Sequence, residues 1–135
     1  MSLFVDTSAL YALLVGSDRG HARVRAAFEQ ALREGTGLLT TSYALVETTT
    51  LLQHRIGLDA VRDLDRSLAP VLDVEWISPQ VHAKAMKRLL RESRREVSLV
   101  DWVSFEVMRG SGISRALTLD RHFGDEGFEV VPPPA

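Results

Sequence analysis

The chain has 135 residues, of which 45% are apolar and 25% charged, and its formal net charge is −2. This length allows one domain with a hydrophobic core and is too short for two. The chain contains no cysteine, which excludes disulfides, thiolate metal ligands and cysteine nucleophiles. We find no basic N-terminal segment typical of a signal peptide, and no apolar run near the ~20 residues that span a membrane. We therefore expect a cytoplasmic protein.

Short apolar runs typical of buried strands alternate along the chain with segments of helical periodicity. The strands are expected at residues 3–5, 38–41, 74–77, 115–118 and 128–131. The helices are expected at residues 7–15, 19–34, 43–55 (capped by Ser42), 59–68, 78–96 and 98–109. This alternation predicts an α/β fold with a mostly parallel sheet of about five strands, covered on both faces. Residues 1–131 would form this single domain, and the proline-rich residues 132–135 a C-terminal tail.

Four acidic residues lie at joints between the predicted strands and helices. Asp6 and Asp120 follow strands, whereas Glu47 and Asp101 lie near the starts of helices. Because ligands of parallel sheets bind beyond the carboxyl ends of the strands, all four side chains can project towards one end of the sheet. Clustered carboxylates repel one another unless a cation neutralises them. Oxygen ligands without sulfur favour Mg²⁺ or Mn²⁺, so the pattern predicts phosphoryl chemistry in which a metal activates water.

Three of these acids have a structural alternative when each is taken alone. Asp6 can cap the helix that follows it, and Asp120 can cap the short turn that follows it. Asp101 fits the capping box Ser-x-x-Asp that begins at Ser98. Glu47 lies among apolar residues and threonines, with no basic residue three or four positions away. The conjunction of all four acids, rather than any single one, therefore predicts the metal site.

Together with their neighbours, the acids form an ordered set of motifs. In chain order these are Asp6-Thr7-Ser8, Glu47, Ser98-x-x-Asp101, Asp101-x-x-Ser104-Phe105-x-Val107-Met108 and Thr118-x-Asp120 with Phe123. Over nearly the whole chain, the set resembles the PIN domain, and specifically the VapC-type toxins of toxin–antitoxin pairs. The resemblance implies an α/β/α sandwich with Mg²⁺- or Mn²⁺-dependent ribonuclease activity. It also implies an RNA substrate, a cognate antitoxin protein and a homodimer.

The resemblance carries over to individual positions. The implied catalytic and metal-binding set is Asp6, Glu47, Asp101 and Asp120, supported through hydrogen bonds by Ser8 and Thr118. Asp6 and Asp101 would be the primary ligands, and the other two acids would complete the cluster or orient the attacking water. Asp125 is a rival to Asp120 as the fourth acid. After the third acid many members have small residues, whereas this chain has Trp102 and Phe105.

Other side chains permit two interpretations each. Five basic residues on roughly one face of the helix at 78–96 either hold RNA phosphates or form a solvated surface: Lys84, Lys87, Arg88, Arg91 and Arg94. The four histidines show no metal-ligand spacing, and we interpret His122, beside Asp120, as a surface residue of a turn. The sequence thus predicts a metal-dependent endoribonuclease that hydrolyses RNA phosphodiester bonds. The alternative is a non-catalytic, metal-binding PIN-like domain with a regulatory or scaffold role.

Overall fold

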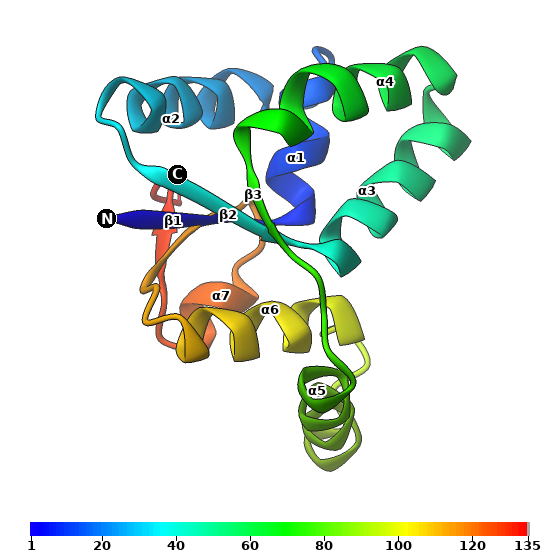
Figure 1. Ribbon diagram of the computed structural model, residues 1–135, viewed down its shortest axis with the longest axis vertical. Coiled ribbons are helices and arrows are strands. Elements are labelled where there is room, and N and C mark those ends of the chain that lie inside the picture. The colour runs from blue at the N-terminus through cyan, green and yellow to red at the C-terminus, as the bar shows by residue number, and fades with distance from the viewer. Residues whose placement is uncertain (135) are drawn as a thin grey trace.

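The computed structural model describes residues 1–134, and in this part of the chain five strands form one sheet. The strands are β1 (Ser2–Val5), β2 (Gly37–Thr41), β3 (Asp73–Glu75), β4 (Arg115–Leu117) and β5 (Glu129–Val131). Their order in the sheet is β3-β2-β1-β4-β5, and every neighbouring pair is parallel (Figure 1). All carboxyl ends therefore lie at the same edge of the sheet.

Helices cover both faces of this sheet. One face is covered by α1 (Thr7–Leu14), α2 (His21–Arg33), α3 (Ser42–Arg55) and α4 (Leu58–Asp63), which lie above the sheet in Figure 1. The other face is covered by α5 (Pro79–Glu92), α6 (Leu99–Gly110) and α7 (His122–Asp125). The predicted α/β/α sandwich with a parallel five-stranded sheet is therefore confirmed.

The central strand β1 is buried on both sides, which explains its uninterrupted apolar sequence. Leu3 and Val5 face the core beneath α1 to α4, whereas Phe4 faces the core beneath α5 to α7. The ring of Phe4 stacks on that of Phe123 with centroids 6.2 Å apart, and Phe105 meets the Phe123 ring edge-on at a centroid distance of 4.9 Å. Each fully buried side chain of this size contributes about 1.5–3 kcal/mol, so the strand that carries Asp6 is firmly held.

The helix predicted to run to residue 96 ends earlier, at Glu92. Ser93 adopts a left-handed conformation with φ of 54°, and its amide donates to the carbonyl of Leu89. The left-handed residue terminates the helix and turns the chain, which lets Val97 enter the core before α6 begins. Arg94 therefore lies beyond the helix on which it was predicted.

The α-helix predicted at residues 59–68 is shorter in the structure than expected. Only Leu58–Asp63 is α-helical, and a π-helical turn, η1 (Leu64–Leu68), and a 3-10 turn, η2 (Ala69–Val71), follow it. Pro70 has no amide hydrogen and cannot continue the α-helical bonding, and the amide of Ala69 reaches back to Leu64 instead. Both Leu64 and Leu68 remain buried in this arrangement.

Thr41, rather than the predicted Ser42, caps α3. Its hydroxyl accepts the amide of Ala44 at 3.0 Å. The Ser42 hydroxyl instead accepts the amide of Ile77 at 3.0 Å and thereby fixes the segment after β3. That amide is consequently not available for strand pairing, and β3 ends at Glu75 rather than at residue 77.

A hydrogen bond joins the predicted tail to the body of the protein. A guanidinium nitrogen of Arg23 on α2 donates to the carbonyl of Pro133. Ala135, the last residue of that tail, lies outside the described residues. None of the helices described at residues 1–134 has the length and apolar character needed to cross a membrane.

Candidate active site at the carboxyl edge of the sheet

Asp6 directly follows β1 and occupies the N-cap position of α1, but its side chain does not cap that helix. Its own amide donates to the carbonyl of Leu117, which aligns it with the end of β4. The capping alternative for Asp6 is therefore wrong. Its carboxylate lies almost fully buried, with 2% exposed, at the edge where ligands of parallel sheets bind.

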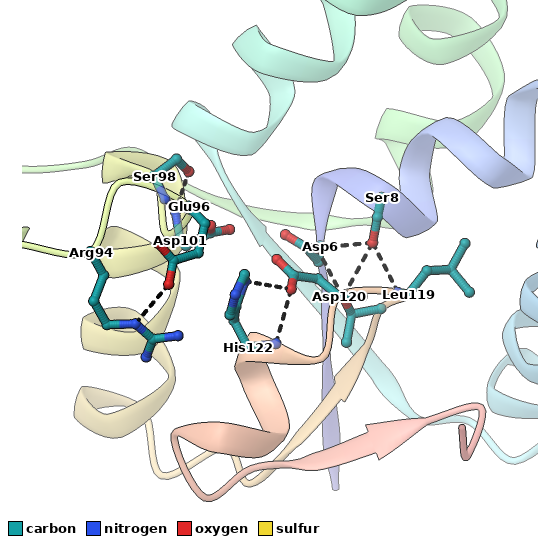
Figure 2. Close-up of polar contacts among 10 residues, drawn as sticks. Asp6, Ser8, Arg94, Glu96, Ser98, Asp101, Leu119, Asp120 and His122 are labelled. Carbon is teal, nitrogen blue, oxygen red and sulfur yellow. Dashed lines mark hydrogen bonds and ion pairs between the residues drawn. The ribbon is translucent and has the colours of Figure 1, made fainter. Parts of the chain in front are cut away.

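Two hydroxyl groups hold one oxygen of this carboxylate. Asp6 Oδ2 accepts hydrogen bonds from Thr118 Oγ1 at 2.9 Å and from Ser8 Oγ at 3.0 Å (Figure 2). The same hydroxyls accept backbone amides in turn, Thr118 from Asp120 and Ser8 from Leu119, each at 2.9 Å. Because each hydroxyl has one proton, accepting an amide directs that proton towards Asp6. The hydrogen bonds expected for Ser8 and Thr118 are therefore present.

The other oxygen of Asp6, Oδ1, is buried and has no hydrogen-bond partner among the described residues. The pKa of Asp6 is raised to about 7, mainly by burial and next by the nearby charge of Asp101, against the opposing effect of the two hydroxyls. A buried carboxylate oxygen without a partner is costly unless a cation meets it. The Oδ1 atom of Asp6 is therefore suited to bind a divalent cation.

Asp101 lies both in the capping box of α6 and in the cleft, as its sequence context allowed. It closes the predicted capping box of α6, with Ser98 Oγ accepting its amide at 3.1 Å and its Oδ2 accepting the Ser98 amide at 2.9 Å. The same carboxylate lines the cleft beside Asp6. Burial raises the pKa of Asp101 to about 6, and the charges of Asp120 and Glu47 act in the same direction. The capping bonds reduce this rise without abolishing it.

Asp120 lies after β4 and holds the turn that leads into α7. Its Oδ1 accepts the backbone amide of His122 at 2.9 Å, and the Nδ1 atom of the same histidine lies 2.8 Å away (Figure 2). The side chain of His122 is only 12% exposed, so its interpretation as a surface residue is wrong. Asp101, Asp120 and His122 each offer a possible ligand atom, all within 4.8 Å of one another. Asp125, the rival acid, is exposed on α7 and is not part of the cleft.

The four predicted acids line one open cleft of about 360 Å³ at the carboxyl edge of the sheet. They come from four separate elements of the chain: the end of β1, α3, α6 and the segment after β4. A fifth carboxylate, that of Asp18, also lines the cleft. Burial is the main cause of the raised pKa values of Asp6 and Asp101, and the like charges of the neighbouring carboxylates add to it.

Arg55 and Tyr11 are among the lining residues that were not predicted as part of the site. Arg55 lies on α3 with its guanidinium carbon 5.8 Å from the centre of the Tyr11 ring, and both residues line the cleft. The four-residue spacing of Glu47, Leu51 and Arg55, which places all three along one side of α3, is the signal that could have identified Arg55.

The basic residues predicted on α5 have different environments. Lys84, Lys87 and Arg91 are exposed. Arg88 is only 22% exposed and forms ion pairs with two carboxylates, those of Glu92 and Glu126.

The guanidinium of Arg88 also lies 4.5 Å from the centre of the Trp102 ring. Trp102 and Phe105, the bulky residues after the third acid, are fully buried with their ring centroids 5.5 Å apart. They fill the core between α6 and its neighbours rather than the cleft. The departure from the small residues of many PIN domains is thus accommodated by packing.

Comparison with known proteins agrees with this geometry. Residues 3–128 match the family profile described as the PIN domain. The chain belongs to the PIN domain family. It is 35% identical over 132 residues to the 23S rRNA-specific endonuclease VapC20 of Mycobacterium tuberculosis, covering 97% of this chain and 98% of that protein. The resemblance to VapC-type toxins is therefore confirmed.

Solved structures extend the comparison to three dimensions. The crystal structure of Mycobacterium tuberculosis VapC20, described as a toxin that cleaves the sarcin-ricin loop, matches with a TM-score of 0.81 over 94% of this chain and 96% of that chain. FitAcB from Neisseria gonorrhoeae matches with a TM-score of 0.69 over 95% of each chain. At 13% identity, this second match shows the fold alone.

Proposed function

We propose that this protein is a metal-dependent endoribonuclease, the toxin of a toxin–antitoxin pair, which cleaves structured RNA in the cytoplasm. The observation that carries this proposal is the unpartnered, buried Asp6 Oδ1 atom in a cleft lined by three further family-matched acids. A purely structural carboxylate would have both oxygens satisfied. The VapC20 relative is described as cleaving the sarcin-ricin loop of 23S rRNA, so the same class of structured ribosomal RNA is the substrate that we propose here.

Asp6 and Asp101 are the proposed primary ligands of Mg²⁺ or Mn²⁺. A cation held there would supply charge to polarise the phosphate and to activate a water for in-line attack. Ser8 and Thr118 occupy Oδ2 of Asp6 and so leave Oδ1 to the cation. Because both hydroxyls donate to the carboxylate, they also favour its ionised form, which is the form that binds metal.

Glu47 and Asp120 complete the acidic cluster in this proposal. Asp120 is oriented by the backbone amide of His122, whereas Glu47 has no hydrogen-bond partner to restrain it among the described residues. Glu47 is therefore suited to bind through water or to orient the attacking water. The exposed basic residues Lys84, Lys87 and Arg91 remain proposed contacts for RNA phosphates outside the cleft.

An apolar groove of about 420 Å³ is the proposed site for the antitoxin. Its apolar lining comes from α1, α2 and the turns before β3: Leu13, Leu14, Phe28, Leu32, Leu68 and Val71. Arg25 and Glu29 at its rim supply charges of both signs, as expected for an amphipathic partner helix. The surface that we propose for the homodimer consists of exposed apolar residues elsewhere: Val46 on α3, Ile56 directly after α3, and Leu58 on α4.

The proposal is tested with purified protein freed of any antitoxin. Cleavage of ribosomal RNA should require Mn²⁺ or Mg²⁺ and should stop when EDTA is added. Asp125→Asn, which removes an exposed acid outside the cleft, provides the matched control for Asp101→Asn. Metal binding without any cleavage would favour the scaffold alternative, and equal cleavage by Asp101→Asn and wild type would contradict the proposed site.

A further inference from the structure

The cleft contains one basic side chain among its acidic ones. Its lining includes five carboxylates, from Asp6, Asp18, Glu47, Asp101 and Asp120. Arg55 is the single lysine or arginine among the described residues that line it. An RNA strand that enters this cleft brings a phosphate with every nucleotide, and the acids repel each one that lies away from a bound cation. A second positive group is therefore needed along the path of the strand.

Arg55 is held in position without being neutralised. Its guanidinium carbon lies 5.8 Å from the centroid of the Tyr11 ring, within the range of a cation–π contact. It forms no ion pair within residues 1–134, although acids line the same cleft, and its side chain is exposed. Stacking on an aromatic face leaves the edge of the guanidinium, with its N–H donors, open to a ligand.

The position of Arg55 along α3 determines which phosphate it can meet. Glu47 and Arg55 are eight residues apart on this helix, which corresponds to about 12 Å along the helix axis. Within residues 1–134 the guanidinium makes no ion pair with any carboxylate of the cleft, so it is not engaged by the acids themselves. It is placed to meet another phosphate of the same strand.

Resting on the proposed function, we propose that Arg55, oriented by Tyr11, binds a backbone phosphate of the RNA that flanks the scissile one. The planar guanidinium offers two parallel donors to phosphate oxygens, which fixes the direction of the strand as well as its charge. Arg55 is thus a substrate-positioning residue for the cleavage reaction.

A purely structural role for Arg55 can be separated from this one. Arg55 lies in the last turn of α3, where any cation interacts favourably with the helix dipole. Arg33 has the equivalent place in the last turn of α2 and lies outside the cleft. Arg33→Gln is therefore the matched control for Arg55→Gln, because both remove one charge from the end of a helix.

The test measures the binding of a fluorescent RNA hairpin by anisotropy at several salt concentrations, with Ca²⁺ as the oxygen-binding cation. Arg55→Gln should weaken binding about tenfold, as expected for a lost charge-assisted hydrogen bond. It should also lower the slope of log K against log salt by about one. Arg33→Gln should bind as wild type, and Arg55→Lys should fall between. Tyr11→Leu should weaken binding while Tyr11→Phe, which keeps the ring, should not.

Thermal melting of each variant establishes that it is folded at the temperature of the assay. Equal affinity and equal salt slope for Arg55→Gln and Arg33→Gln would overturn the inference and leave metal-dependent cleavage intact. If wild type cleaves no RNA with Mn²⁺ but Arg55→Gln still binds the hairpin more weakly, the proposed function fails and the phosphate contact stands. If wild type does not bind the hairpin at all, both are overturned.

Discussion

The two sides of the cleft hold their carboxylates in different ways. On the strand side, Asp6 makes no capping bond to α1 and is held by the hydroxyls of Ser8 and the distant Thr118. On the helix side, Asp101 closes the capping box of α6 and so stabilises that helix while it lines the cleft. The difference teaches that helix capping and the proposed metal binding are separable at Asp6 but fall on the same carboxylate at Asp101.

The largest expected effect is on catalysis, and it should be similar on both sides. Asp6→Asn and Asp101→Asn should each lower the rate of RNA cleavage by more than ~100-fold, because loss of a charged metal ligand exceeds the 10–100-fold typical of its supporting residues. Single-turnover cleavage with Mn²⁺ measures this effect. Asp125→Asn should cleave as wild type, and a comparable loss in that control would show that the effect is not specific to the cleft.

The pH dependence of stability should report mainly on the strand side. The pKa values of about 7 for Asp6 and about 6 for Asp101 both lie above the ordinary value of 3.8, so the folded state binds more protons than the unfolded state. The protonated carboxyls of Asp6 and Asp101 contribute their full stabilisation of the folded state below about pH 4. This stabilisation is lost as the pH rises through 6 and 7. At about 1.4 kcal/mol for each unit of pKa difference, the stability without metal should therefore fall by up to ~6 kcal/mol between pH 4 and pH 7.5.

Urea unfolding in EDTA across this range measures that slope. Asp6→Asn should flatten it, and a slope unchanged by this substitution would contradict the raised pKa of Asp6. Mn²⁺ should reverse the trend, because metal competes with protons for the same oxygens and stabilises the folded state more as the pH rises.

Substitutions at Asp101 and at Asp6 should have different effects on the free energy of unfolding. Asp101→Ala should cost ~0.5–2 kcal/mol through loss of the cap, whereas Asp101→Asn should stay near wild type because Asn also caps helices. Asp6→Asn should be as stable as wild type in EDTA or more so, because one repelling charge is gone. Urea unfolding at pH 7.5 distinguishes these outcomes, and a large loss of stability in Asp6→Asn would show that the two sides do not differ.

The smallest effect is expected from the supporting hydroxyls. Thr118→Val keeps the shape of the side chain but removes a donor to Asp6 and an acceptor for the Asp120 amide. We expect a loss of ~1 kcal/mol in stability and about tenfold in Mn²⁺ affinity, as for other residues that orient metal ligands. Calorimetric titration with Mn²⁺ measures the affinity, and Thr50→Val, an exposed threonine on α3, serves as the control. Unchanged affinity would assign Thr118 a purely structural role.

Local sequence signals predicted the fold and the convergence of the four acids at one edge of the sheet. The alternation of apolar strands with helices required a parallel sheet, and the carboxyl edge of such a sheet is where Asp6, Glu47, Asp101 and Asp120 meet. The capping box of Asp101 was also visible, because it depends on residues three positions apart.

Features that depend on contacts between distant elements were not predicted. Arg88 is drawn into ion pairs and onto Trp102 by the packing of α5 on α6, and no spacing along α5 indicates this. The burial of His122 and the contact between Arg55 and Tyr11 likewise depend on how separate elements meet. The left-handed Ser93 ends α5 at Glu92, although the helical periodicity of the sequence predicted a helix to residue 96.

The bond between Thr118 and Asp6 joins residues that are 112 positions apart. A ribosome synthesises Asp6 before it synthesises Thr118 and Asp120. β1 pairs with β4 on one side, and until β4 exists, that side of the central strand has no neighbour. A growing chain therefore lacks both the hydroxyl that holds Asp6 and the fourth acid of the cleft. For an enzyme proposed to attack RNA, this order of synthesis delays the competent site until the segment after β4 has been made.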